Sequence, residues 1–305
     1  MTARSTAVDS TVLQDIPQKG RLLRVVMLRR KFPSRRERQL TIYMVLGIFA
    51  LFLNIPFYYM CITALKSAHE MAQIEASFWV YEPTLESVRT LLHGSSYIHA
   101  GLNSAVIAAL STLGNLIFCP MAGYAFAKLK FPGKEKIFLL LLSSMMIPAT
   151  VLLVPGFLLA RDLGWINSFA ALVVPGLANV FFVYLSRQFM LKVPDILLQA
   201  ARLDGCSEFR IYFQIVLPLC RPLLATIGIL TFLGSWNSFI GPMVYLFDEK
   251  LYTLPLVISM LQGRFKSQES IQMAGSMLSI LPVLILFVIL QKQIIDSFAN
   301  SGLKE

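Results

Sequence analysis

Charged residues are scarce in this sequence. Only 14% of its 305 residues are Asp, Glu, Lys or Arg, against roughly a quarter in soluble domains, and 56% are hydrophobic. The mean hydropathy is +0.66. This composition excludes an ordinary water-soluble domain. The apolar residues also come in stretches of about 20 or more, long enough to cross about 30 Å of hydrocarbon as a helix. The sequence therefore predicts an all-α integral membrane protein.

Metal and redox motifs are missing as well. The four cysteines show no CxxC spacing and have no histidine nearby, and the three histidines fall at irregular spacing in one loop. We therefore predict no metal site and no redox pair, with the cysteines as packing residues and the histidines as solvated loop residues. These residues are Cys61, Cys119, Cys206, Cys220, His69, His93 and His99.

The sequence also lacks a phosphate-binding loop. No GxxxxGK[ST] motif occurs, because Gly133-Lys134 is followed by Glu135 and has no upstream glycine at the required spacing. The chain therefore has no ATP site of its own, and we expect it not to be an enzyme. Any ATP and Mg²⁺ used to drive it would bind to a separate ATPase subunit.

Two other classes of membrane protein have little support. An ion-coupled secondary carrier needs ionisable residues deep in the membrane, whereas Arg187 and Arg221 lie toward the ends of the expected spans, where their side chains can reach the interface. An integral membrane enzyme acting on lipid-linked substrates needs a catalytic constellation at one face. The acids Asp204 and Glu208 are interpreted as surface charges instead. Both classes remain as alternatives.

Six apolar stretches are expected to cross the membrane as helices. They cover residues 41–65, 102–127, 137–160, 168–191, 217–246 and 273–295. Proline or glycine interrupts each one, which membrane helices tolerate where neighbouring helices satisfy the freed carbonyls. We expect a packed bundle with kinks at Pro56, Pro120, Pro148, Pro155, Pro175, Gly228, Gly234 and Pro282.

The distribution of Lys and Arg predicts the orientation. The segments on the side of the amino terminus hold 21 Lys or Arg and the opposite loops hold 6. The positive-inside rule then places both termini in the cytoplasm. The domain order is a basic cytoplasmic tail 1–40, a permease domain 41–295 and a short cytoplasmic tail 296–305. This topology explains the net charge of +10 without nucleic acid as a partner.

The expected outer loop 66–101 carries four acids and the aromatic residues Phe78, Trp79 and Tyr81 among others. Two interpretations are open. The loop is long enough for a small extracytoplasmic cap, and aromatic residues also gather at the interface between a bilayer and water.

The expected cytoplasmic loop 193–218 is typical of two short helices joined by a turn. Pro194 and Asp195 suit a first helical turn, Gly205 can adopt a positive φ, and Ser207 can cap the second helix, which ends near Pro218. The expected apolar faces are Ile196, Leu197, Ala200 and Leu203 on the first helix, and Phe209, Tyr212, Phe213 and Val216 on the second. Taken alone, this pattern fits an elbow in the cytoplasm or an amphipathic loop on the lipid surface.

The spacing within this loop resembles the EAA loop of ABC importer permeases. The matching residues are Gln199-Ala200-Ala201, then Gly205, then Ile215-Val-Leu217-Pro218. Gln199 replaces the usual Glu of the family and loses its charge, so no ion pair is transferred to this position.

Further motifs are similar to the carbohydrate branch of these permeases, and the carboxyl-terminal residues from Gln291 resemble the maltose-permease G-type subunit. The resemblance covers about residues 41–305. The motifs are Asn103-Ser-Ala-Val-Ile107, Gly123-Tyr-Ala-Phe-Ala-Lys-Leu-Lys-Phe-Pro-Gly133, Ile147-Pro148, Gly164-Trp-Ile-Asn167, Arg202-Leu-Asp-Gly205 and Phe232-Leu-Gly-Ser-Trp-Asn-Ser-Phe239.

The resemblance implies a type I ABC importer permease fold with six transmembrane helices, in the bacterial inner membrane. It implies a heterodimer with a related permease, two ATPase subunits that bind ATP and Mg²⁺, and an extracytoplasmic solute-binding protein. In this family the loop forms the coupling helices that dock into a cleft on the ATPase. The positions that inherit this role are Gln199, Ala200, Ala201, Arg202, Asp204, Gly205, Ile215, Leu217 and Pro218.

Uncharged polar residues within the spans suit a neutral, hydroxyl-rich solute. Hydrogen bonding between helices explains each of them equally well, so both interpretations stay open. The solute-path candidates are Asn115, Asn179, Tyr184, Trp236 and Asn237. The solute itself is open among oligosaccharides, monosaccharides and compounds of the glycerol-phosphate type.

Overall fold

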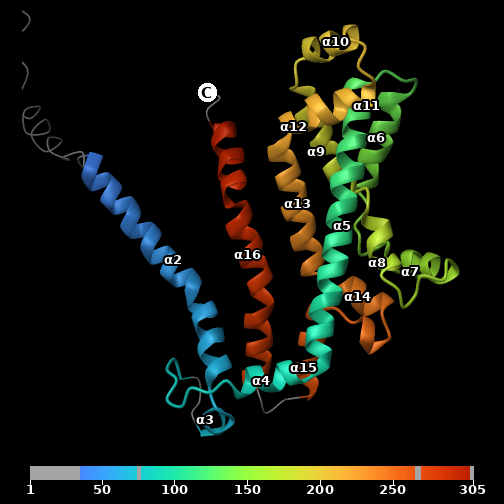
Figure 1. Cartoon of the computed structure of the whole chain (residues 1–305). Helices are drawn as coiled ribbons and strands as arrows, with labels where there is room; N and C mark the ends of the chain where they lie inside the picture. Colours follow the sequence, from blue (N-terminus) through green and yellow to red (C-terminus); the bar gives the residue numbers. More distant parts are fainter. Residues whose placement is uncertain (1–34, 74–76, 265–268, 303–305) are drawn as a thin grey trace, which may run out of the picture. The chain divides into compact units, whose positions relative to one another are not determined.

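The computed structural model describes residues 35–73, 77–264 and 269–302 (Figure 1). The chain divides into two compact units, residues 1–56 and 57–305, and each is considered by itself. In the described parts, all regular elements are helices. They are α2 Arg35–Leu65, α3 Ala68–Gln73, α4 Glu86–His93, α5 Ser95–Lys128, α6 Lys134–Ser144, α7 Leu153–Asp162, α8 Ala170–Val173, η1 Val174–Gly176, α9 Val180–Leu191, α10 Asp195–Leu203, α11 Glu208–Ile211, the π-helix η2 Tyr212–Val216, α12 Leu217–Leu219, α13 Arg221–Trp236, α14 Ile240–Tyr245, η3 Glu249–Leu251, α15 Leu254–Arg264 and α16 Glu269–Gly302.

Four helical segments of the described chain are long and apolar enough to cross a membrane. They are 38–65 in α2, 96–128 in α5, 170–191 from α8 to α9, and 269–289 in α16. A fifth is present if α11–α12 and α13 count as one bent span. These segments confirm an integral membrane protein built from helices, and the crossing by six spans stays a prediction.

The third expected span is broken rather than continuous. The chain leaves helical geometry between α6 and α7, where Met145, Met146 and Ile147 donate backbone hydrogen bonds to carbonyls only three residues back. Pro148 follows and has no backbone N–H to continue the ladder. The expectation of one helix over 137–160 was therefore wrong, although the kink predicted at Pro148 lies within the break.

The fifth expected span also differs from the prediction. Instead of one helix over 217–246, α12 and α13 meet at Cys220 in a bent pair whose axes differ by 80°. Helix α13 then ends at Trp236, and α14 is a separate short helix. Gly228 and Gly234 were expected to interrupt this span, yet both lie inside the unbroken α13.

In the long helices, proline does not end the helix. Pro56, Pro120 and Pro282 lie inside α2, α5 and α16, which continue past them.

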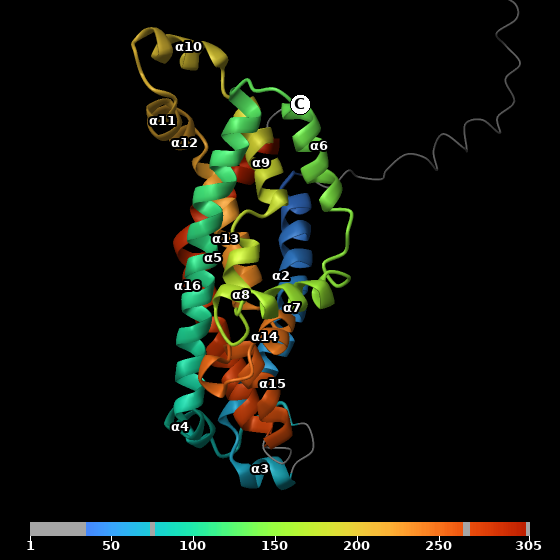
Figure 2. The same ribbon diagram turned by 90° about the vertical axis from the view of Figure 1, so that its right-hand side faces the viewer.

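Helix α5 connects the two ends of the larger unit. In both ribbon views the short helices α10 to α12 lie at one end of α5 and α4 lies at the other (Figures 1 and 2). Near the first end, α5 packs tightly on α9 at Gly123. A Cβ atom there would lie 2.3 Å from the Cβ of Ser186 and 2.9 Å from the amide nitrogen of Arg187. Only glycine allows this approach.

Two apolar cores hold the larger unit together. The first gathers side chains from α5, α6, α9, the short helices α10 to η2, and α13, and includes Phe138, Met190, Leu198, Ile211 and Leu223. The second lies toward the other end of α5 and includes Leu91, Tyr97, Trp236, Leu254 and Ile271. The first core fixes the 193–218 segment to the end of the bundle.

Two buried charges shape the loop after α2. The ammonium group of Lys66 donates to the carbonyl of Ser77, 2.5 Å away, and the carboxylate of Glu70 accepts from the backbone amides of Tyr81 and Glu82 at 3.2 Å. Trp79 and Tyr81 are left exposed. The loop is thus an ordered turn that presents aromatic rings at its surface.

Candidate functional site

Residues 193–218 form an elbow of two short helices, as the sequence predicts. Gly205 has φ of +79°, in the left-handed region that glycine adopts without strain. Its amide donates to the carbonyl of Arg202 at 3.1 Å, and the amide of Cys206 donates to Ala201 at 2.9 Å. This pair of bonds is a Schellman motif, which ends α10 and reverses the chain.

The second helix of the elbow begins at a side-chain cap. Ser207 is extended, and its Oγ accepts a hydrogen bond from the amide of Arg210. The predicted cap is confirmed. The helix runs through η2 and α12 to Leu219, so it ends one residue after Pro218, at the bend before α13.

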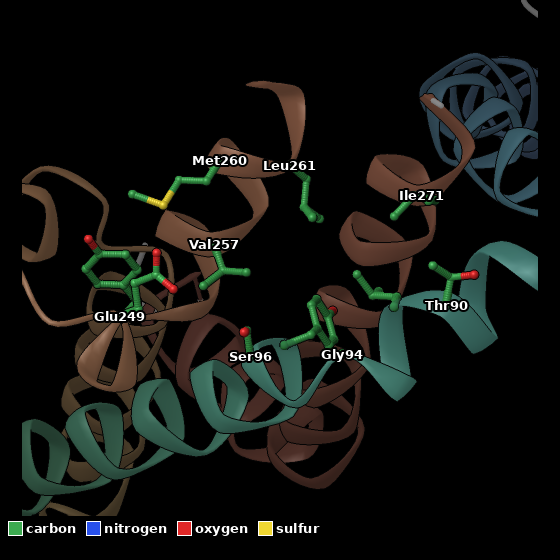
Figure 3. Close-up of a pocket in the computed structure, with 11 residues that line it drawn as sticks. Thr90, Gly94, Ser96, Glu249, Val257, Met260, Leu261 and Ile271 are labelled. Atoms are coloured by element: carbon green, nitrogen blue, oxygen red, sulfur yellow. The ribbon is translucent and has the colours of Figure 1, made fainter. Parts of the chain in front are cut away.

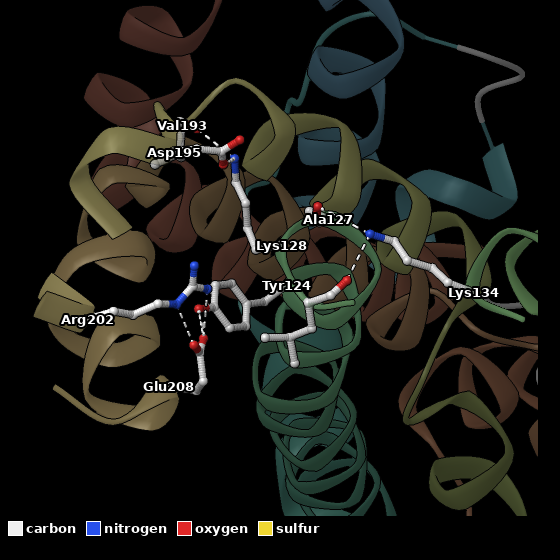
Figure 4. A network of polar contacts seen from close by, with 9 residues as sticks. Tyr124, Ala127, Lys128, Lys134, Val193, Asp195, Arg202 and Glu208 are labelled. Carbon is white, nitrogen blue, oxygen red and sulfur yellow. Dashed lines mark hydrogen bonds and ion pairs between the residues drawn. The ribbon is translucent and has the colours of Figure 1, made fainter. Parts of the chain in front are cut away.

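Lys128, at the end of α5, holds the start of the elbow (Figure 4). Its Nζ donates to the carbonyl of Val193 and to Oδ1 of Asp195, each at 2.6 Å. The Lys128 side chain is only 4% exposed, whereas Asp195 faces solvent. The hydrogen bond from Lys128, with its charge, lowers the pKa of Asp195. The pair therefore stays ionised as pH falls below the usual range of aspartate, and is lost only when pH passes the lowered pKa.

Tyr124, one helical turn before Lys128, holds the second helix. Its hydroxyl donates to Oε2 of Glu208 at 2.7 Å, and Oε1 of the same carboxylate accepts from Nε of Arg202 at 2.7 Å (Figure 4). Glu208 thus links α10, α11 and α5. Glu208 is therefore a charge at the surface of the elbow, with its side chain 41% exposed, that also makes structural hydrogen bonds. We call the contacts of Tyr124 and Lys128 with the elbow the α5 clamp.

The apolar face predicted for α10 lies on the outside of the elbow and does not pack into the core. The residues of α10 that enter the core are Leu198 and Ala201, whereas the expected apolar face lies exposed, with Leu203 89% exposed. In the second helix the predicted apolar face is divided, because Tyr212 and Val216 are buried whereas Phe209 and Phe213 are exposed. Five large apolar side chains of the elbow are therefore exposed, and we call them together the elbow surface: Ile196, Leu197, Leu203, Phe209 and Phe213.

The residues matched to the EAA loop fall on both sides of the elbow. Ala201 is buried, and Ile215 and Leu217 are half-buried. The other matched residues lie at the solvent-exposed side next to the elbow surface, and they are Gln199, Ala200, Arg202, Asp204, Gly205 and Pro218.

The solute-path candidates do not form one group. Asn115 is 2% exposed, and its amide donates to the carbonyls of Ser111 and Gly176 at 2.9 and 2.7 Å. Its Oδ1 accepts from the amide of Asn179 at 3.2 Å. Asn179 in turn caps α9 through the amide of Phe181. These two asparagines stabilise the break between η1 and α9, and both also line a cavity.

Trp236, Asn237 and Tyr184 lie elsewhere. The indole Nε1 of Trp236 donates to the carbonyl of Ser279 at 3.1 Å, and its ring stacks on Phe232. Trp236 thereby ties α13 to α16, and together with Asn237 it lines a second cavity. Tyr184 stacks on Phe138 and lines neither cavity.

A further cavity of about 180 Å³ lies at the end of α5 away from the elbow (Figure 3). Apolar side chains from α15 and α16 form part of its wall, with Val257, Leu261 and Ile271 facing it and Glu249 at one side. Nothing in its wall matches a predicted site residue.

The sequence did not predict the α5 clamp. Tyr124 and Lys128 lie 84 and 67 residues from their partners Glu208 and Asp195. A signal was present, because both residues belong to the motif of residues 123–133 that resembles other permeases. The motif indicated the resemblance to other permeases, but it did not indicate which residues Tyr124 and Lys128 contact.

Comparisons with known proteins agree with this geometry. Residues 119–299 match the model of the family described as "Binding-protein-dependent transport system inner membrane component". The arabinooligosaccharides transport system permease protein AraQ of Bacillus subtilis (strain 168) is 32% identical over 86% of this chain and 93% of that protein. The lactose transport system permease protein LacG of Rhizobium radiobacter is 26% identical over 90% of this chain and 98% of that protein.

The fold also matches a solved structure. The crystal structure of a bacterial ABC transporter involved in the import of the acidic polysaccharide alginate superposes with a TM-score of 0.74 and 26% identity, covering 86% of this chain and 98% of the other. The predicted recognition and fold class are therefore confirmed. The chain belongs to the family of inner membrane permease components of binding-protein-dependent ABC transport systems.

Proposed function

We propose that this permease imports carbohydrate, as one of two related permease subunits that form a heterodimer. Two ATPase subunits bind and hydrolyse ATP with Mg²⁺ and drive it from the cytoplasm. An extracytoplasmic binding protein delivers the solute. The names of AraQ and LacG, and the alginate transporter, support carbohydrate as the solute class.

The elbow surface is the observation that carries the coupling part of this proposal. Large apolar side chains exposed as a group mark a surface that a partner covers. Here they lie on a segment that is capped, closed by a Schellman motif and held by the α5 clamp at its start and at the beginning of its second helix. A rigid element of this kind transmits a push from a partner to the membrane helices, since both of its helices are bonded to α5.

The elbow faces the cytoplasm in this proposal. Lys128, Lys134, Arg187 and Arg202 all take part in contacts near the elbow end of α5. Basic residues concentrate on the cytoplasmic side of membrane proteins. In the larger unit, the carboxyl-terminal end of α16 lies toward the same end as α10 (Figure 1), which supports a cytoplasmic carboxyl terminus. The amino terminus is placed there by the charge count alone.

Uptake measurements test the carbohydrate assignment. Cells that carry or lack the gene are given radiolabelled arabinotriose, lactose or an alginate trisaccharide. We expect the gene to raise uptake of at least one of them by about tenfold or more, and ATP depletion to remove this uptake. Equal uptake of all three with and without the gene would show that carbohydrate is the wrong solute class.

A further inference from the structure

The loop that follows α2 brings aromatic side chains back against that helix. The hydroxyl of Tyr58 donates a hydrogen bond to the carbonyl of Phe78 at 3.1 Å. The ring of Tyr59 packs edge-on against the ring of Phe78, with centroids 5.7 Å apart. Trp79 and Tyr81 follow in the same loop. We call Phe78, Trp79 and Tyr81 together the loop rings.

These contacts show that the loop folds back along α2. The helix ends at Leu65, so Tyr58 and Tyr59 lie about 10 Å before its end along the axis, at 1.5 Å per residue. Phe78 touches both of them and therefore lies at the same level. The chain thus returns beside the helix before it reaches Trp79.

This level corresponds to the outer boundary of the hydrocarbon. The apolar segment 38–65 has 28 residues, and a helix of that length measures about 42 Å. A bilayer is about 40–45 Å thick with its headgroups, and its hydrocarbon core takes about 30 Å of this. The last turn of such a span lies among the headgroups. A point about 10 Å before its end then lies within about 5 Å of the edge of the hydrocarbon.

Two buried charges hold the backbone on both sides of Trp79. Lys66 is 3% exposed, and its ammonium group donates to the carbonyl of Ser77. Glu70 is 4% exposed, and its carboxylate accepts from the amide of Tyr81 at 3.2 Å. The loop rings therefore leave the protein from a fixed backbone.

The loop rings are exposed although the charges beneath them are buried. Phe78, Trp79 and Tyr81 are 55%, 70% and 68% exposed. A loop surrounded by water favours the reverse arrangement, because burying a charge costs free energy and burying an aromatic ring is favourable. Trp and Tyr are enriched where a bilayer meets water, since their rings leave water there while their polar edges stay hydrated.

The surroundings of the loop rings favour lipid as the partner. On α2, Phe57 and Tyr58 are 51% and 47% exposed, so the loop rings continue the exposed apolar side chains of the membrane-crossing segment. Residues 77–85 contain one acid, Glu82, and no Lys or Arg. Attraction to anionic headgroups therefore plays no part, and the rings fit the uncharged layer beneath the phosphate groups.

We propose that the loop rings insert into the outer leaflet, between the phosphate groups and the acyl chains of phospholipids, and that Glu70 holds them in this position. The loop is then a membrane-anchoring surface at the outer end of α2. The proposal does not depend on which solute is imported, so its test is independent of the test of carbohydrate import.

Quenching of Trp79 fluorescence tests the insertion. The assembled transporter is placed in phosphatidylcholine vesicles whose acyl chains carry bromine either near the carboxyl end or near the methyl end. The difference between the native chain and Trp79→Phe gives the signal of Trp79. We expect bromine near the carboxyl end to quench it about twofold more than bromine near the methyl end, and iodide in the water to quench it weakly. Added phosphatidylglycerol should change neither result.

Trp236 provides the matched control. It is 5% exposed, and its indole donates to the carbonyl of Ser279 inside the bundle. The difference between the native chain and Trp236→Phe should show weaker quenching by both brominated lipids. Equal quenching of Trp236 and Trp79 would overturn the insertion, because it would mean that bromine reaches tryptophans regardless of their exposure.

Glu70→Ala tests how the loop rings are held. The change removes the acceptor for the amides of Tyr81 and Glu82, so we expect lipid quenching of Trp79 to fall about twofold or more and iodide quenching to rise. Glu82→Ala is the control, because it removes an exposed acid of the same loop and leaves the backbone amide in place. It should match the native chain. If Glu70→Ala also matched it, the role of Glu70 would be overturned.

Two further results would overturn the insertion itself. Strong quenching of Trp79 by iodide, with no quenching by either brominated lipid, would show that the loop rings face water. Loss of the lipid quenching when the extracytoplasmic solute-binding protein is added would show that this protein, rather than lipid, covers the rings.

Discussion

Gly205→Pro should abolish solute uptake while leaving the chain in the membrane. The left-handed φ of +79° at Gly205 is closed to proline, whose ring holds φ near −65°. Proline also removes the amide that bonds the carbonyl of Arg202. The Schellman turn would open, and the two elbow helices would lose their fixed angle. The membrane helices lie outside this turn and should still insert.

Gly164→Pro is the matched control for this prediction. Gly164 has φ of +70°, its amide donates to Arg161 at 3.0 Å, and the amide of Trp165 donates to Ala160 at 2.8 Å. It therefore ends α7 with the same kind of turn that ends α10. We expect uptake to fall by more than about tenfold for Gly205→Pro and by much less for Gly164→Pro. Equal losses at the two glycines would mean that a broken turn anywhere stops transport, which contradicts a special role for the elbow.

Removing the α5 clamp should uncouple ATP hydrolysis from transport. Tyr124→Phe deletes the hydroxyl that bonds Glu208, and Lys128→Met deletes the ammonium group that bonds Val193 and Asp195. Neither change strands a buried charge, because Glu208 keeps Arg202 and Asp195 is solvent-exposed. The double variant should therefore fold and bind its partners. We expect its uptake to fall about tenfold, with ATP hydrolysis by the complex continuing.

Lys134→Met controls for the loss of a lysine at this end of the bundle. Nζ of Lys134 donates to the carbonyls of Leu129 and Ala127, so it ties the α5–α6 turn and does not touch the elbow (Figure 4). Its uptake should stay within about twofold of the native value. If the double clamp variant transported as well as Lys134→Met, the clamp would have no part in coupling.

Local chemistry predicted the long helices and the turn of the elbow. Residues 41–65, 102–127 and 273–295 were recognised from their length and apolarity, and they lie within α2, α5 and α16. Gly205 and Ser207 were recognised because a left-handed turn and a helix cap depend on single residue types. The break at Pro148 was marked, but the sequence alone could not distinguish a kink from a full interruption.

The orientation of α10 could not be predicted in the same way. An apolar face shows that something covers a helix, but it does not show whether the cover is the helix's own chain or a partner. Leu203 and Ile196 belong to such a face and are exposed, while Leu198 enters the core. The α5 clamp was missed because its contacts join residues that are 84 and 67 positions apart in the sequence.

Cross-linking from the elbow surface tests the central claim most directly. A benzophenone attached to the thiol of a Leu203→Cys variant, in a chain that also carries Cys206→Ser, reports which protein lies next to α10. We predict a cross-link to the ATPase subunit in membranes that contain the assembled transporter, with a yield that changes when ATP is added. The account would be contradicted if no ATPase cross-link formed and a membrane-impermeant thiol reagent labelled the same position from outside intact cells.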